Sequence, residues 1–208
     1  GQVVLSDIGV IVQELHNKGI YVIARIVVFE DQNLVKTRPE LAIYDKSGVN
    51  NNLSWIDPSS KEAWEYNISI AKDTVNLGFD ELNFDYVRFP SDRQIEDMGF
   101  PFWDKKVPMR LVIKEFFQKL RESLPDVKLS VDLFGYSTVS TDDMGIGQVL
   151  EDSFDYFDYI SPMVYPSHYR NDFRGYSNPA QYPYEVIKYS MEEALKKQTA
   201  YYNKLQIT

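Results

Sequence analysis

The run from Gly78 to Pro90 constrains this chain more than any other part of its sequence. It follows a helical pattern and stops at a proline, which predicts a β-strand over about 80–89. Successive side chains of a strand point to opposite faces, so one face carries Leu82, Phe84 and Tyr86. The other face carries Glu81, Asn83 and Asp85. Burying charges without partners is costly, so this polar face is either wet or part of a site.

The rest of the chain alternates helical and strand patterns. Apolar, β-branched runs predict strands at 21–28, 128–134 and 159–165. Helical spacing predicts helices from Ser6, from Asp57-Pro58, over 113–124 and from Pro183, with a short helix around 148–152. This order predicts one domain over 1–208 with a parallel sheet built from right-handed βαβ units.

The loops differ at the two ends of this sheet. Helix-to-strand joints are short, whereas the strand-to-helix joints at about 29–56, 90–104, 135–147 and 166–182 are long and rich in polar and aromatic residues. In parallel α/β folds these long joints share the C-terminal end of the sheet, where active sites lie. Asp85 is predicted to point to that end.

Only four strands are visible in the 208 residues, whereas a (β/α)8 TIM-type barrel needs eight strands and about 250 residues. Two interpretations are open. The chain is the central part of a barrel, or it is an open or oligomer-completed half-barrel. Unpaired strand edges and an exposed apolar face would favour self-association in either case.

Composition excludes several classes of function. The net charge of −9 argues against nucleic acid and anionic membrane surfaces as partners. The absence of cysteine excludes disulfides, zinc thiolates and thiol nucleophiles, and two histidines argue against a histidine-based metal site. No stretch is apolar enough for membrane insertion, and no signal peptide opens the chain. No metal or cofactor is expected, because no metal-ligand spacing, Gly-rich phosphate loop or serine nucleophile elbow is present.

Two carboxylates are the best candidates for chemistry. Asp85 and Asp132 are predicted on neighbouring strands, and a strand spacing of about 4.8 Å would place them on the order of 5 Å apart. That separation suits the nucleophile and acid/base pair of a retaining glycosidase, and two close like charges raise one pKa, as a general acid requires. The alternative is that Arg25, on the inward face of the first strand, neutralises one or both in a structural ion pair.

Aromatic and polar side chains near the same end are candidates for sugar binding. Trp55 and Trp103, in the long loops, are the best stacking candidates. Tyr165 is predicted to end the last strand, on the same face as Ser161 and Met163. His168, in the loop that follows, could hydrogen-bond a sugar hydroxyl or a catalytic carboxylate. Asn83 and Glu81 share the polar face with Asp85.

Three charged residues near these candidates are given no role in the site. Glu30 and Asp31 are interpreted as solvated loop charges. Strict alternation points Arg88 outward.

Three segments resemble a known family: Tyr21–Phe29, Gly78–Pro90 and Tyr159–Tyr169. Together they are similar to the bacterial "putative glycosyl hydrolase domain" family, formerly a domain of unknown function and related to the (β/α)8 glycosidases. The resemblance implies that the chain covers strands three to six of a barrel, with Asp85 at the end of the fourth. That position resembles the nucleophile position of the alpha-amylase superfamily, although Asn83 stands where that superfamily carries arginine.

The sequence therefore predicts a glycoside hydrolase that cleaves a polysaccharide, with Asp85 as nucleophile and Asp132 as acid/base. Arg25, Asn83, Glu81, Tyr165 and His168 would orient or bind the sugar. The alternative is a catalytically silent carbohydrate- or cell-wall-binding module on the same scaffold. A third interpretation is a fragment without a function of its own. An extracellular or cell-envelope location in a bacterium is expected.

Overall fold

The fold is a mixed α/β arrangement around a parallel sheet. The computed structural model describes residues 7–47 and 54–205. Within them, four strands form one parallel sheet in the order β1 (Ile23–Val27), β3 (Glu81–Asp85), β5 (Leu129–Phe134) and β6 (Tyr159–Met163). These are the four predicted strands, and their pairing in chain order is the one expected for consecutive right-handed crossovers.

Helices connect these strands. The α-helices are α1 (Ile8–His16), α2 (Gln32–Thr37), α3 (Lys61–Asn76), α4 (Met109–Ser123) and α5 (Pro183–Leu205). Short 3-10 helices occupy the loops: η1 (Pro39–Leu41), η2 (Gly135–Thr138), η3 (Leu150–Ser153), η4 (Pro166–His168) and η5 (Pro179–Gln181). A separate antiparallel pair joins β2 (Tyr44–Asp45) to β4 (Met98–Gly99).

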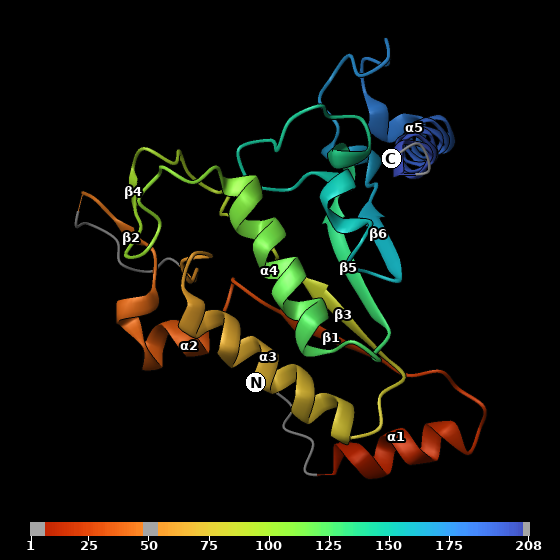
Figure 1. Ribbon diagram of the computed structural model, residues 1–208. Helices are drawn as coiled ribbons and strands as arrows, with labels where there is room; N and C mark the ends of the chain where they lie inside the picture. Colours follow the sequence, from red (N-terminus) through yellow and green to blue (C-terminus); the bar gives the residue numbers. More distant parts are fainter. Residues whose placement is uncertain (1–6, 48–53, 206–208) are drawn as a thin grey trace.

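The core lies between the sheet and two helices. Figure 1 shows α3 and α4 side by side over one face of the sheet, with α5 beyond β6. Leu82 and Phe84 of β3 are fully buried on that face, as alternation predicts. They belong to one cluster with Trp64 of α3 and Phe116 of α4, whose rings lie 5.5 Å apart. Burial of these large side chains fixes the helix-covered side.

The other face of the sheet is open in this chain. Its side chains are mostly polar, and exposure is highest on the two outer strands, with Ile23 of β1 at 49% and Tyr159 of β6 at 52%. The central strands place Asn83 and Asp132 on this face, where both are half-buried. Helices therefore cover the apolar face, while the polar face carries the candidate site.

Two local expectations are wrong. Helix α3 begins at Lys61 with Ser60 as its N-cap, three residues after Pro58. Asp57 does not cap it, because its buried carboxylate accepts the backbone N–H groups of Phe102 at 2.7 Å and Trp103 at 3.0 Å. Asp57 thus ties two strand-to-helix loops together instead of starting a helix.

The second concerns the 29–56 segment, interpreted as a loop with solvated charges. It contains α2, and the carboxylate of Asp31 caps that helix by accepting the N–H groups of Asn33 and Leu34. The six-residue helix is too short to leave a clear period in the sequence.

Candidate functional site

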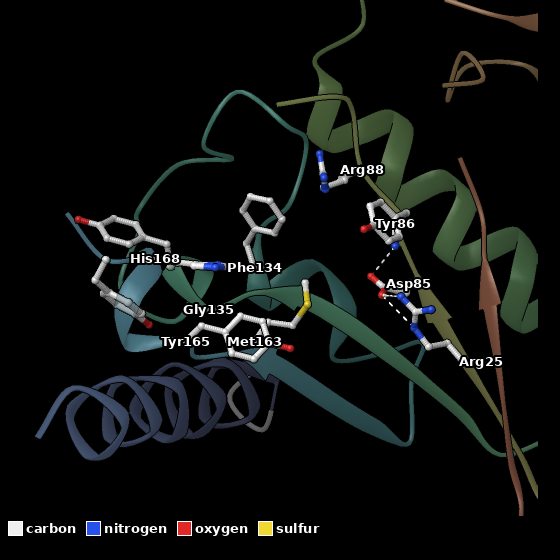
Figure 2. Close-up of a pocket in the computed structure, with 11 residues that line it drawn as sticks. Arg25, Asp85, Tyr86, Arg88, Phe134, Gly135, Met163, Tyr165 and His168 are labelled. Carbon is white, nitrogen blue, oxygen red and sulfur yellow. Dashed lines mark hydrogen bonds and ion pairs between the residues drawn. The ribbon is translucent and has the colours of Figure 1, made fainter. Parts of the chain in front are cut away.

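A pocket opens at the C-terminal ends of β1, β3, β5 and β6, where the long loops meet. Its volume is about 430 Å³, within the range of small-molecule sites. The lining residues are Arg25, Asp85, Tyr86, Arg88, Phe134, Gly135, Tyr136, Met163, Tyr165, His168 and Tyr169. Figure 2 shows Asp85 and Arg25 facing Tyr165 and His168 across this space.

Asp85 is the carboxylate of this pocket. It ends β3, and its neighbour across the sheet is Val27, two residues beyond Arg25. The Arg25 Nε donates to Asp85 Oδ2 at 3.1 Å, and Arg25 Nη2 pairs with the same oxygen. The hydrogen bond from the Tyr86 backbone N–H, at 2.7 Å, satisfies Oδ1. The hydrogen bond to Asp85 raises the pKa of Arg25, so the cation stays charged beside the carboxylate.

Asp132 lies on the neighbouring strand. Phe84 pairs with Val131, so Asp85 and Asp132 are the next positions along adjacent strands. Asn83 links the two strands: its amide donates to Asp132 Oδ1 at 3.1 Å and to Ser130 Oγ at 3.2 Å. Burial raises the pKa of Asp132, and the charge of Asp85 raises it further, against the opposing effects of Asn83 and Arg25.

The two carboxylates do not line the same hollow. Asp132 lines a more open hollow of about 370 Å³ that continues from the pocket, and Met163 and Tyr165 contribute to both. Alternation predicted the orientation of Asp132 but could not show this offset.

His168 lies in the loop after β6, as predicted, whereas Tyr165 lies there instead of on the strand, because β6 ends at Met163. Both line the pocket, and their rings are 5.1 Å apart in an edge contact. Tyr165 remains about half exposed, so one side of its ring is free for a ligand.

Four expected binding residues do not line the pocket. Asn83 lies outside its lining, because its amide bonds Ser130 and Asp132 instead. Glu81 is at the first position of β3, the opposite end of the strand, where it accepts a hydrogen bond from Tyr21 Oη at 3.0 Å. Trp55 is 1% exposed and Trp103 is 9% exposed, so neither offers a ring face for stacking. Trp103 instead packs on Phe89 with ring centroids 4.9 Å apart. Loop position alone misled the prediction, because these loops fold back into the core.

Other rings line the pocket instead. Tyr86, Phe134 and Tyr136 lie at or just beyond the end of a strand, and Tyr169 follows η4. Gly135 lies between two of them, where a Cβ would collide with the carbonyl of Met163 at the end of β6 and lie 2.8 Å from Val164 Cα. The sequence Phe134-Gly135-Tyr136 directly after a strand was a signal that could have identified them.

Arg88 was predicted to point outward and instead lines the pocket. Tyr86 has a left-handed backbone with φ of 56°, which ends the strand's alternation and turns the following residues. Arg88 is only 7% exposed, and burial lowers the pKa of its guanidinium. This cation is a site residue that strict periodicity missed.

Glu30 is also less solvated than expected. It is half-buried, and burial raises its pKa, followed by the effect of Asp92. It does not line the pocket.

The described part of the chain contains neither a metal-ligand cluster nor a membrane-spanning helix. Residues 7–47 and 54–205 hold no group of three or more His, Asp or Glu side chains placed to bind a metal ion. None of the helices in these ranges is both long and apolar enough to cross a bilayer.

Comparison with known proteins assigns the family. The model of the family described as "Putative glycosyl hydrolase domain" matches residues 1–206. The chain belongs to this family. No curated protein matches it.

Several solved structures resemble the chain. A hypothetical protein from Ruminiclostridium thermocellum ATCC 27405 is 37% identical with a TM-score of 0.54, over 66% of each chain. The glycoside hydrolase domain of PelA from Pseudomonas aeruginosa is 13% identical with a TM-score of 0.54, over 92% of this chain and 69% of that one. An alpha-galactosidase from Thermus thermophilus, in complex with stachyose, is 16% identical with a TM-score of 0.50, over 79% of this chain and 33% of that one.

These likenesses bear on the fold. The two glycoside hydrolases have TIM-barrel-type folds, and at their low identity the similarity shows the fold alone. The chain spans 66% of the R. thermocellum protein and a third of the galactosidase.

Proposed function

We propose that this protein is a glycoside hydrolase that cleaves O-glycosidic bonds of a polysaccharide with two carboxylates. The family assignment and the TIM-barrel-type neighbours support this class of reaction. The observation that carries the proposal is Asp85, a nearly buried carboxylate at the C-terminal end of a parallel strand, inside a pocket of about 430 Å³.

In this proposal the four strands are the third to sixth of a (β/α)8 barrel. The position of Asp85 supports it, because catalytic residues of such barrels come from the C-terminal ends of several strands. Closing the barrel would cover the open face of the sheet and complete the pocket wall opposite Asp85.

Asp85 acts as the nucleophile and Asp132 as the general acid/base. Arg25 binds one oxygen of Asp85, which orients the carboxylate and leaves Oδ1 held only by a backbone N–H. The raised pKa of Asp132 is the direction that a general acid needs. Adjacent strands lie about 4.8 Å apart, which favours a retaining mechanism over an inverting one.

Substrate is held by residues of the pocket wall, and Asn83 acts from outside the lining. Asn83 orients Asp132, while Tyr165 and His168 contact the sugar from the opposite wall. The substrate would be met outside the bacterial cell or at its envelope.

One observation favours a second candidate, a carbohydrate-binding module without catalysis. Arg25 already neutralises Asp85, and Asp132 lies outside the pocket that holds Asp85. The same scaffold could then bind a glycan without cleaving it.

Replacing Asp85 with Asn separates the two candidates. We expect reducing-sugar release from a polysaccharide panel to fall roughly 10⁴-fold while glycan binding is kept, because the shape of the pocket survives. Glu81→Gln is the matched control, since Glu81 is on the same face of the same strand and equally buried but outside the pocket. Its activity should stay within a few-fold of wild type. If wild type binds a glycan and releases no sugar, the module replaces the enzyme.

A further inference from the structure

Arg88 is a buried cation without an ion-pair partner among residues 7–47 and 54–205. In the described part of the chain, no carboxylate forms a salt bridge with it. Asp92, Glu30 and Asp85 act on it only through space. Asp92 accepts the indole N–H of Trp55 at 3.0 Å, and Asp85 is held by Arg25. A buried charge without an ion-pair partner is costly, so an external anion bound to Arg88 would be stabilising.

The guanidinium of Arg88 is held in a fixed orientation. Its carbon lies 4.6 Å from the ring centroid of Trp55 and 4.6 Å from that of Phe134. Nη1 donates to the Phe89 carbonyl at 3.0 Å and to Ser91 Oγ at 3.2 Å. Nε and Nη2 donate to no other described residue. These two N–H groups form the planar fork that binds both oxygens of a carboxylate.

The charge balance of the pocket also favours an anionic ligand. Among the described residues, its lining contains two cations, Arg25 and Arg88, and one carboxylate, Asp85, which Arg25 already binds. The protein as a whole carries a net charge of −9, so this balance is local to the pocket. Figure 2 shows Arg88 and Asp85 on the same wall, separated by Tyr86.

We infer that the pocket takes an acidic sugar, a uronic acid unit whose carboxylate binds the Nε and Nη2 fork of Arg88 while Asp85 faces the ring. This rests on the proposed function for the cleavage step, but the recognition itself is a binding property. A neutral sugar could offer Arg88 hydroxyl acceptors but no negative charge, so the buried cation would stay without an ion-pair partner. The specificity of the pocket therefore lies in one charged contact next to the catalytic carboxylate.

Calorimetric titration tests the inference with matched sugars. The probes are trimers of galacturonate, mannuronate and glucuronate, each beside its carboxyl-reduced, neutral form. We expect wild type to bind at least one uronide about 10–100-fold tighter than its neutral form, the ratio that a charge-assisted fork supplies. Arg88→Gln should remove this preference, and Arg88→Lys should keep only part of it because the fork is lost.

Arg93→Gln is the control variant, since Arg93 pairs with Asp45 outside the pocket. It should bind as wild type does. Equal binding of neutral and acidic trimers, a preference that survives in Arg88→Gln, or no uronide binding at millimolar concentration overturns the inference. Should Arg88→Gln fail to fold, the Arg88→Lys preference and the wild-type ratio still decide it.

The outcome is separable from that of the proposed function. A uronide that binds through Arg88 and is never cleaved leaves the inference standing and removes the hydrolase. Cleavage of neutral glycans without a uronide preference supports the hydrolase and overturns the inference about Arg88.

Discussion

Two arginine–aspartate pairs in this molecule look alike in burial but differ in geometry. Arg25–Asp85 joins an arginine side chain that is 54% exposed to an aspartate that is 8% exposed. Arg110–Asp152 joins side chains that are 46% and 6% exposed. In the first pair both donors of the guanidinium contact one oxygen, Oδ2. In the second, Nε and Nη2 contact different oxygens, at 3.0 Å and 2.9 Å.

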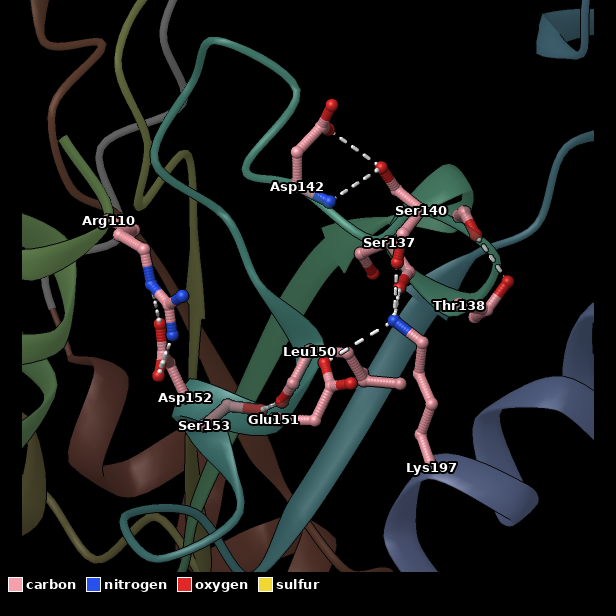
Figure 3. Close-up of polar contacts among 11 residues, drawn as sticks. Arg110, Ser137, Thr138, Ser140, Asp142, Leu150, Glu151, Asp152, Ser153 and Lys197 are labelled. Atoms are coloured by element: carbon pink, nitrogen blue, oxygen red, sulfur yellow. Dashed lines mark hydrogen bonds and ion pairs between the residues drawn. The ribbon is translucent and has the colours of Figure 1, made fainter. Parts of the chain in front are cut away.

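The second pair belongs to a structural clamp on η3. Asp152 is bound by Arg110 and, at 3.3 Å, by Lys114, one turn later on α4. On the other side, Lys197 of α5 pairs with Glu151 and donates to the carbonyl oxygens of Ser137 and Ser140 (Figure 3). These contacts tie η3 to two helices and to the η2 loop.

The difference separates structural from functional carboxylates. Asp152 has both oxygens engaged by cations, so it has no capacity left for chemistry. Asp85 keeps one oxygen bound only by a backbone N–H and faces a pocket. A buried ion pair therefore does not by itself identify a structural role, because the distribution of donors over the two oxygens also matters.

The largest effect should come from Asp152→Asn. It removes one charged hydrogen bond and turns an amide toward two cations, so the free energy of unfolding should fall by about 2–4 kcal/mol. Asp85→Asn should change it by only about 1 kcal/mol, because Arg25 can keep its single acceptor oxygen. Urea unfolding at neutral pH measures both. Equal losses of unfolding free energy in the two variants would contradict the difference between Asp152 and Asp85.

The arginine partners should show a smaller contrast. Arg110→Met leaves the buried Asp152 with Lys114 alone, which we expect to cost about 2 kcal/mol. Arg25→Met should cost less than about 1 kcal/mol, since Arg25 is more than half exposed and Asp85 faces the pocket. Sugar release should instead fall about 10²-fold in Arg25→Met, because the nucleophile loses its orientation. Sugar-release kinetics and thermal unfolding, measured for both variants, check that Arg110→Met mainly lowers stability and Arg25→Met mainly lowers activity.

The smallest effect concerns Asp132 and depends on pH. Burial raises the pKa of Asp132 above the ordinary value of 3.8. The protonated carboxyl is therefore favoured in the folded state, and the stability it contributes is complete below pH 3.8 and is lost as pH rises through the folded pKa. Asp132→Asn should therefore be more stable than wild type at pH 7, with the gain disappearing near pH 3.

Asp80→Asn is the control, because the stability that Asp80 contributes should depend on pH in the opposite direction. The Val22 N–H, at 2.6 Å, and His16 lower the pKa of Asp80, so its contribution is present at neutral pH and lost on acidification. This variant should be less stable at pH 7. A gain of stability in both variants, measured by urea unfolding at the two pH values, would contradict the assignment of Asp132.

Alternation predicted the sheet well because its rule is local. The polar row of Asn83 and Asp85 and the buried positions of Leu82 and Phe84 follow from a period of two along one strand. The order of strands follows from the rule that consecutive parallel strands lie side by side. The roles of Asp85 and Asp132 stay proposals.

The errors come from interactions between distant residues. Tyr86 adopts a left-handed backbone beside the Trp55 ring, and this turn redirects Arg88. Asp57 finds its donors 45 and 46 residues away, at Phe102 and Trp103, so it leaves the helix end. No period or propensity within either segment records such contacts.

The position of Trp55 gives the pocket an optical reporter. Its indole packs against the guanidinium of Arg88, so a change in the charge beside Arg88 alters the electric field at an emitting ring. Trp64 and Trp103, the other two tryptophans of the chain, lie away from the pocket lining. With phenylalanine at those two positions, the intrinsic fluorescence of one residue would report each ligand that enters, without label or turnover.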